Sequence, residues 1–129
     1  MVQTGTVQAA IEGYFAANNA LDANAVADLF APDAQMHRVP GRSPTEGREA
    51  IRQVYQQLLA AFSRSDVNPM HTFIAGNGAA VLYRGTFTAK TGESVVVEGI
   101  DVFEVNEGGQ IEAIRFYWDP APLATVLRR

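Results

Sequence analysis

Residues 94–106 read SVVVEGIDVFEVN, and their alternating pattern decides the fold. In a strand every second side chain points to the same face, so every second residue from Val95 to Val105 lies on one face. That face is apolar except at Asp101. Burial disfavours the charged form of a carboxyl group, so an inward Asp101 would either pair with a cation or keep its proton. The alternative is that Asp101 lies at a dimer interface or at a sheet edge.

The strand pattern continues on both sides of this segment. We expect further strands near residues 67–75, 79–89 and 110–118. Turns at 90–93 and 106–109 contain glycine, which adopts the positive φ that hairpin turns require. Consecutive hairpins predict an antiparallel sheet in the second half of the chain.

Helical periodicity fills the first half. Residues 7–15 and, more strongly, 45–62 place apolar side chains one turn apart. Asp22 is a good N-cap for a short helix that ends near Ala31 and Pro32. A short strand is expected at 34–39 and a loop at 40–44.

Helices followed by a meander predict an α+β fold. We expect one domain over residues 1–129, with three N-terminal helices packed in a strongly curved antiparallel sheet. Two prolines end the last strand. Beyond them, Leu123, Val126 and Leu127 are expected to pack against a partner or against the mouth of a pocket.

The composition is globular, with 129 residues, 47% apolar and 19% charged. A formal net charge of -4 argues against a nucleic-acid partner. The chain has no cysteine, which excludes disulfides and thiolate metal sites. No signal-peptide pattern is present, and no apolar run approaches the roughly 20 residues that cross a membrane. We therefore expect a cytoplasmic protein that binds a small molecule and neither nucleic acid nor a membrane.

A few polar residues are candidates for a site. Tyr14 and Tyr55 lie on the apolar stripes of their helices, either as core tyrosines or as hydrogen-bonded groups of a pocket. Arg84 is either solvated or the partner of an inward acid. His37 and His71 do not have metal-ligand spacing and no cofactor motif occurs, so we expect neither a metal nor a cofactor.

The chain resembles ketosteroid isomerase, within the nuclear transport factor 2-like or SnoaL-like superfamily. The resemblance extends over about residues 7–119 and rests on Tyr14, Asp33-Ala34, Gly47-Arg48-Glu49, Tyr55, Ile100-Asp101-Val102 and Phe116-Tyr117-Trp118. It implies a cone-shaped α+β fold with a deep apolar pocket. It also implies a homodimer that packs through the outer face of the sheet.

The resemblance implies a chemistry as well. In this family a carboxylate base takes a proton beside a ketone, and a tyrosine and a protonated aspartate hold the resulting dienolate oxygen. Those two oxygen-binding positions match Tyr14 and Asp101. Tyr55 matches a second tyrosine that supports the first, and Phe116 and Trp118 match aromatic residues of the pocket.

The position of the family's base is occupied here by Arg38, which cannot release its proton at ordinary pH. A register shift of one residue would bring His37 inward instead, because alternate strand residues face opposite ways. His37 has a suitable unperturbed pKa for a base. If Arg38 and Arg84 both point inward, Asp101 would be ionised and paired, and the pocket would suit an anionic or polar ligand.

Two classes of function remain open from the sequence. The first is an isomerase or lyase-type enzyme that acts on a small carbonyl or cyclic metabolite. In it Tyr14 and Asp101 stabilise charge on oxygen, and His37 or a water moves the proton. The second is a non-catalytic ligand-binding or dimerising module. Epoxide hydrolases on this fold, which use an Asp–Arg–Asp arrangement, are a further and partial likeness, since one inward Asp is visible.

Overall fold

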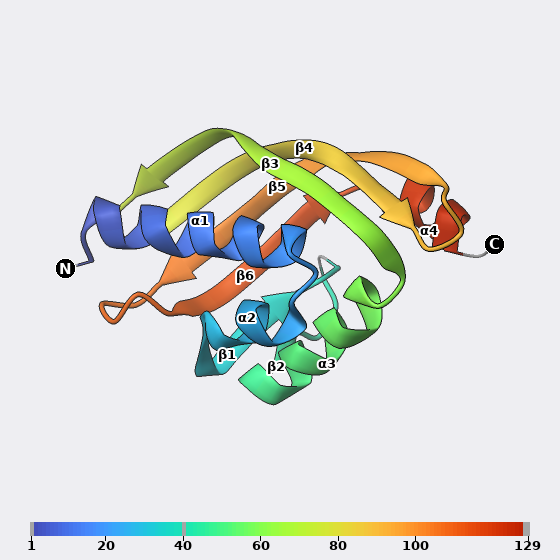
Figure 1. Cartoon of the computed structure of the whole chain (residues 1–129). Helices are drawn as coiled ribbons and strands as arrows, with labels where there is room; N and C mark the ends of the chain where they lie inside the picture. Colours follow the sequence, from blue (N-terminus) through green and yellow to red (C-terminus); the bar gives the residue numbers. More distant parts are fainter. Residues whose placement is uncertain (1, 40, 128–129) are drawn as a thin grey trace.

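A six-stranded sheet curves round helix α1 in the computed structural model, which describes residues 2–39 and 41–127 (Figure 1). The strands follow the spatial order β2-β1-β6-β5-β4-β3. Their bounds are β1 (Phe30–His37), β2 (Thr45–Glu46), β3 (Phe62–Ala75), β4 (Gly78–Ala89), β5 (Ser94–Val105) and β6 (Ile111–Trp118). The protein is thus an α+β domain with an open, curved sheet, as its pattern predicts.

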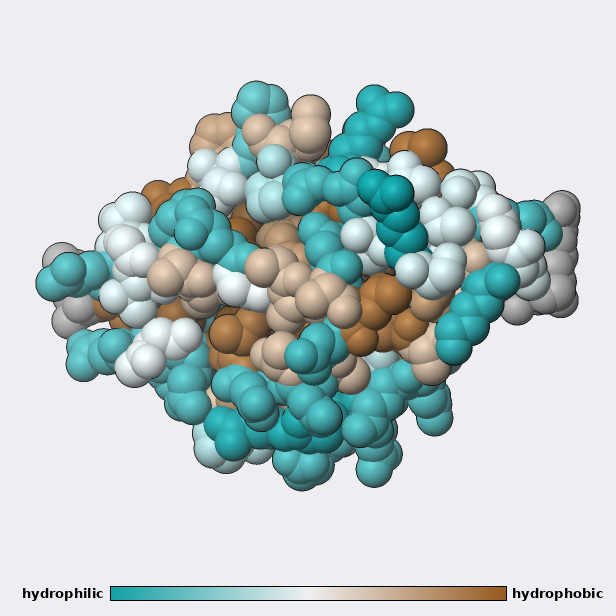
Figure 2. All heavy atoms as spheres, viewed as in Figure 1, coloured by the Kyte–Doolittle hydropathy of each residue, from teal (hydrophilic) through white to brown (hydrophobic). Residues whose placement is uncertain are grey.

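Three helices precede the long strands and one follows them. Their bounds are α1 (Thr4–Asn19), α2 (Ala23–Asp28), α3 (Arg48–Leu59) and α4 (Ala121–Leu127). Helix α1 lies along the concave face of the sheet, whereas α2 and α3 lie below it, where hydrophilic residues dominate the surface (Figures 1 and 2). Asp22 caps α2 as expected, since its carboxylate accepts a hydrogen bond from the Ala25 amide at 3.0 Å.

The inner face of the sheet and the apolar stripe of α1 form the core. The largest fully buried side chains include Ile11, Phe30, Met36, Phe62 and Phe103. The last residue of α1, Asn19, fixes this helix on β3: its amide donates to the Val67 carbonyl at 2.9 Å, and its side-chain oxygen accepts from the Val67 amide at 3.0 Å. This attachment holds the inward stripe of α1 over the sheet.

The expectation of a purely antiparallel sheet is wrong at one edge. Strand β1 pairs with β6 in parallel, whereas the other neighbouring strands are antiparallel. Helix α3 and four strands lie between β1 and β6 in the sequence. Parallel neighbours need such a long connection, so the local hairpin patterns cannot reveal this pairing. The β1 strand also starts at Phe30, earlier than expected, and contains Pro32. Its pairing with β6 is irregular between Phe30 and Gln35, which accommodates a residue that cannot donate to the ladder.

Smaller differences have local causes. The strongest helix begins at Arg48 because Gly47 adopts φ 92°, a conformation outside the helix, and Thr45–Glu46 pair with β1 as β2. After the last strand, the chain forms α4, whose Leu123 and Val126 are buried. The side chain of Leu127 and the start of the expected loop at Pro40 lie outside the described residues.

Gly85 allows β3 and β4 to approach closely. A Cβ at this position would lie 2.1 Å from the Asp66 carbonyl oxygen and 2.4 Å from the Val67 Cα. Backbone atoms cannot rotate away, so we expect Gly85→Ala to lower the free energy of unfolding by about 3 kcal/mol, measured by urea denaturation. Gly5→Ala is the matched control, because a Cβ there meets nothing within 4 Å. An equal, small effect of both substitutions would contradict this account.

Candidate functional site

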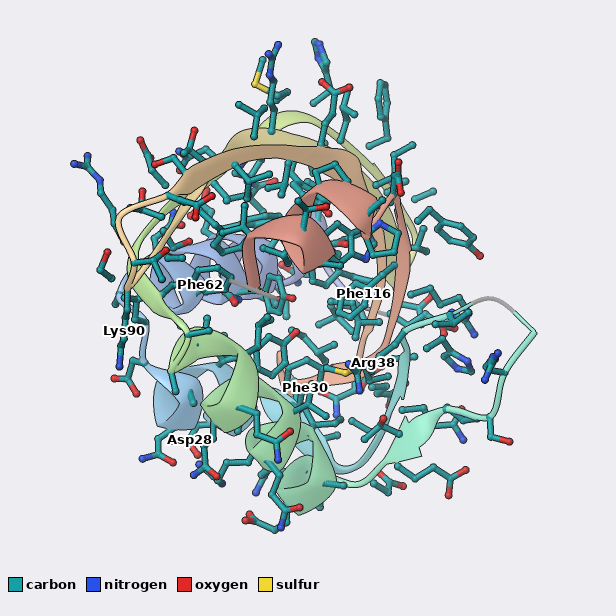
Figure 3. All side chains as sticks on the ribbon, turned by 90° about the vertical axis from the view of Figure 1, so that its right-hand side faces the viewer. Asp28, Phe30, Arg38, Phe62, Lys90 and Phe116 are labelled. Carbon is teal, nitrogen blue, oxygen red and sulfur yellow. The ribbon has the colours of Figure 1, made fainter. Side chains whose placement is uncertain are left out.

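A cavity of about 830 Å³ lies between the concave face of the sheet and helices α1, α3 and α4. This volume is within the range of small-molecule sites. Much of the lining is apolar and includes Met36, Val67, Phe87, Phe116, Trp118 and Leu123. Figure 3 views the molecule from the end at which Arg38 and Phe116 lie on the inner side of the curved sheet.

Two tyrosines from different helices meet at the cavity. The hydroxyl of Tyr14 on α1 and that of Tyr55 on α3 are hydrogen-bonded at 2.5 Å, and both side chains are buried. Burial raises the pKa of Tyr14 well above its usual value, and the neighbouring Tyr55 and Asp101 raise it further. Burial likewise raises the pKa of Tyr55. Both hydroxyls therefore keep their protons and act as hydrogen-bond donors.

Asp101 lines the same cavity from the middle of β5. Its neighbours in the sheet are Val81 on β4 and Phe116 on β6, and the residue is 5% exposed. It forms no hydrogen bond or ion pair with the side chains of the described residues. Burial raises the pKa of its carboxyl group to about 8. This pKa favours the protonated form at neutral pH, and no arginine among the described residues pairs with the carboxyl group.

A third tyrosine, Tyr83 on β4, also lines the cavity. Burial raises its pKa, and the nearby Asp101 raises it further. The hydroxyl occupies space that Gly99 leaves open, because a Cβ on Gly99 would lie 2.8 Å from it and 2.6 Å from the Cβ of Trp118. Sequence reasoning did not single out Tyr83, although alternation along 79–89 places it on the same face as Val81 and Phe87.

Arg38 reaches the cavity and His37 does not. Met36 and Arg38 both line it, as alternate residues at the end of β1 should, and the charge of Arg38 acts to lower the pKa of Tyr55. His37 is half-buried outside the cavity lining, and its buried Nε2 has no hydrogen-bond partner among the described residues. The register shift that would make His37 the base is therefore not seen.

Of the two alternatives for Arg84, the structure shows the solvated one, so the possibility that Arg84 binds a ligand in the pocket is not supported. Arg84 is exposed on the outer face of β4, in register with Glu98 on β5. Alternation places Arg84 opposite Val81 and Tyr83, on the more polar face of the strand, and this is the face that the structure exposes. A different arginine, Arg42, lines the cavity instead from the loop after β1. Loop residues have no periodicity, so no sequence signal identified it.

The predicted aromatic residues are in place, since Phe116 and Trp118 both line the cavity. Among the described residues, no group of three or more His, Asp and Glu side chains is arranged to hold a metal ion. None of the helices in the described part of the chain is long and apolar enough to cross a membrane.

These features define a small α+β domain whose curved sheet encloses a cavity with neutral hydroxyl and carboxyl donors. The SnoaL-like domain family matches residues 11–114. A steroid Delta-isomerase from Nocardioides simplex is 33% identical over 117 residues, which cover 91% of this chain and 93% of that protein. The chain therefore belongs to the SnoaL-like family, and its resemblance to the isomerase group is confirmed.

Solved structures show the same fold. An epoxide hydrolase/cyclase-like enzyme, SalBIII, with a role in pyran ring formation in the polyether salinomycin, superposes with a TM-score of 0.82 at 23% identity. The match covers 95% of this chain and 97% of that one. An NTF2-like protein of unknown function from Burkholderia pseudomallei gives a TM-score of 0.81 at 15% identity, over 96% of this chain and 98% of that one. At these identities the likeness concerns the fold.

The protonated state of Asp101 predicts a pH dependence of stability. The pKa is 3.8 in a model peptide and about 8 in the folded protein. Below about pH 4 the carboxyl group is neutral in both the folded and the unfolded chain, and the folded protein has its full stability. Between about pH 4 and pH 8 only the unfolded chain releases the proton, so the unfolding free energy falls as the pH rises. We expect the unfolding free energy of the wild type to fall relative to that of Asp101→Asn by up to about 1.4 kcal/mol per pH unit.

Urea denaturation at several pH values measures this difference. Asp33→Asn is the control, because Asp33 is an exposed carboxyl group on the same sheet and should give a curve parallel to that of the wild type. If the Asp101→Asn curve were parallel as well, the folded protein would hold Asp101 ionised.

Proposed function

We propose that this protein is an isomerase-type enzyme that acts on a small carbonyl or cyclic metabolite. The observation that carries the proposal is the convergence of Tyr14 and a protonated Asp101 on one largely apolar cavity. Both groups donate a hydrogen bond to an oxygen of the substrate and stabilise the negative charge that develops on it. The similarity to a steroid Delta-isomerase supports this reaction class.

Tyr55 acts through Tyr14 in this proposal. Their hydroxyls are 2.5 Å apart, and a hydrogen bond donated by Tyr55 leaves the Tyr14 proton available to the substrate. Donors that are already oriented in a water-poor site contribute more to transition-state stabilisation than they would in water, about 3–4 kcal/mol for one such donor.

The proton that leaves carbon needs an acceptor other than Arg38. Besides Asp101, no described residue that lines the cavity has a carboxylate or an imidazole. A water or a basic atom of the substrate therefore takes the proton, and the wild type is a poor catalyst of reactions that require a carboxylate base.

This lack of a base also favours the second candidate, a binding protein without catalysis. An epoxide hydrolase of the Asp–Arg–Asp type is disfavoured, because Asp101 is the single aspartate in the described lining.

A gain-of-function variant tests the oxygen-binding site separately from the missing base. In a steroid Delta-isomerase assay we expect Arg38→Asp to be roughly 10²- to 10⁴-fold more active than the wild type, which is the usual contribution of a general base. Arg38→Asn is the matched control of nearly equal size, and it should not gain activity. Addition of Tyr14→Phe or Asp101→Asn to Arg38→Asp should remove the gain.

Two results would contradict the proposal. The first is a wild-type protein as active as Arg38→Asp, which would require an unrecognised base. The second is an Arg38→Asp variant that folds, binds a phenolic ligand and still has no activity, because the donors would then fail to stabilise an enolate. That second result would favour the non-catalytic binding protein.

We further propose that the outer face of the sheet forms a homodimer interface. Large apolar residues are exposed there on neighbouring strands, among them Phe73 (71% exposed), Val96 (55%), Ile100 (41%) and Tyr117 (49%). Ile100 is in register with Tyr117 on one side and with Leu82 on the other, so the apolar residues form a row across the sheet. Figure 2 shows apolar residues among hydrophilic ones along the upper edge, where this face is seen from the side. A second copy of the chain would cover the row with an identical one, as in a two-fold interface.

Light scattering with size-exclusion chromatography tests the dimer. We expect a dimeric mass for the wild type and an increase of at least about tenfold in the dimer dissociation constant for Ile100→Glu, which places a charge in the centre of the row. Ala60→Glu adds the same charge at an exposed position just after α3 and should leave the mass unchanged. A monomeric wild type at the highest concentration measured would refute the interface.

A further inference from the structure

The charged groups of the cavity have the opposite sign to the chain as a whole. The described residues that line it include three with acidic or basic side chains, Arg38, Arg42 and Asp101. Burial raises the pKa of Asp101 to about 8, so it is neutral at pH 7, whereas both arginines keep their charge. The cavity therefore carries two positive charges in a protein whose formal net charge is -4.

Neither arginine is neutralised by a neighbour in the described part of the chain. The ion pairs between described residues involve Arg52 and Arg115, each with glutamate or aspartate. The guanidinium groups of Arg38 and Arg42 form none with a described residue, and both residues are exposed. Their charges are thus available to a molecule that enters the cavity.

The backbone brings the two arginines to the same wall. After β1 the chain turns, with the Arg42 amide donating to the Val39 carbonyl at 3.2 Å and Gly41 at φ 81°. This turn places Arg42 beside the end of the strand that carries Arg38, and Ser43 and Thr45 line the cavity from the same loop. The buried donors Tyr14 and Asp101 come from other elements, α1 and β5, so one cavity has a cationic rim and a neutral, donor-rich interior.

We infer that Arg38 and Arg42 bind an anionic oxyacid group, such as a carboxylate or a sulfate, of an amphipathic substrate. The apolar body of this substrate lies against residues such as Phe116, Trp118 and Leu123, and its carbonyl or hydroxyl oxygen reaches Tyr14 and Asp101. Guanidinium groups bind two oxygens of a carboxylate or of a tetrahedral oxyanion through paired N–H donors, and the apolar body supplies the burial that a free inorganic anion lacks. This inference rests on the proposed function, because it assigns a substrate class to the same cavity.

Matched aromatic probes test the inference by fluorescence titration. 6-Hydroxy-2-naphthoate presents a hydroxyl at one end and a carboxylate at the other, its methyl ester removes the charge alone, and 6-hydroxynaphthalene-2-sulfonate replaces the carboxylate by a sulfonate. We expect the wild type to bind the carboxylate at least about tenfold more tightly than the ester, as charge-assisted hydrogen bonds imply. Added salt should reduce this preference, because the arginines are exposed.

Variants assign the preference to its residues. In Arg38→Gln/Arg42→Gln the carboxylate should lose its advantage, while the affinity for the ester stays within about twofold of the wild type. Arg64→Gln is the control, because Arg64 is an exposed arginine of β3 outside the cavity lining, and it should keep the full preference. A sulfonate that binds as tightly as the carboxylate assigns recognition to charge, whereas a preference for the carboxylate assigns it to planar paired hydrogen bonds.

The outcomes separate this inference from the proposed function. Equal affinities for carboxylate and ester, or a preference that survives in the double variant, would overturn the anion site and leave the cavity's oxygen donors intact. A preference that depends on the arginines, with no effect of Tyr14→Phe on any probe, would support the anion site and overturn the proposed role of Tyr14. Absence of binding by all three probes would overturn both.

Discussion

The burial of one carboxyl group without a cation beside it is the constraint on which the site depends. Asp101 is 5% exposed in the middle of β5, and burial alone accounts for its raised pKa. An ionised group there would lack compensation, so the fold holds it protonated. The neutral carboxyl can then donate a hydrogen bond, which a carboxylate cannot do. The same placement thus lowers the stability of the fold and supplies the donor that the proposed function needs, since an apolar side chain at this position would be more stable.

The shape of the sheet keeps this group accessible to a ligand. A flat sheet would pack α1 against the whole of β5 and fill the space in front of Asp101. The curvature leaves room between the strands and α3, and Gly99 leaves space for the hydroxyl of Tyr83 beside it. The hydroxyls of Tyr14 and Tyr55 are held by their mutual hydrogen bond and by the helices that carry them, at the polar end of the cavity. The apolar residues that surround it line the cavity without filling it.

Periodicity was sufficient to predict the fold class and the inward groups that lie in regular elements. Alternation over 94–106 placed Asp101 inward, and helical spacing placed Tyr14 and Tyr55 toward the core. Periodicity failed where orientation depends on a partner distant in sequence. The parallel pairing of β1 with β6 follows from a crossover that has no local signal. Arg84 faces outward because it alternates with Val81 and Tyr83, whose side chains are buried. Arg42 reaches the cavity through a loop conformation that the sequence does not specify.

The Arg38 guanidinium is separated from the Asp101 carboxyl group within the cavity. This separation explains how Arg38 can occupy the position of the family's base while Tyr14 and Asp101 remain hydrogen-bond donors. An arginine in contact with Asp101 would favour the carboxylate and remove its proton. Arg38 instead follows the end of β1 and is exposed, and its charge affects Tyr55 while no cation contributes to the pKa of Asp101. The cavity therefore keeps two different electrostatic environments, an exposed cationic rim and a buried neutral interior. A molecule with an anion at one end and a weakly basic oxygen at the other fits both environments in one orientation. The reversed orientation would bury the anion beside the protonated Asp101, and the desolvation of the anion would make this orientation unfavourable. In the proposed function, arginine at the position of the family's base gives a cavity that selects and orients its ligand by charge instead of one that removes a proton.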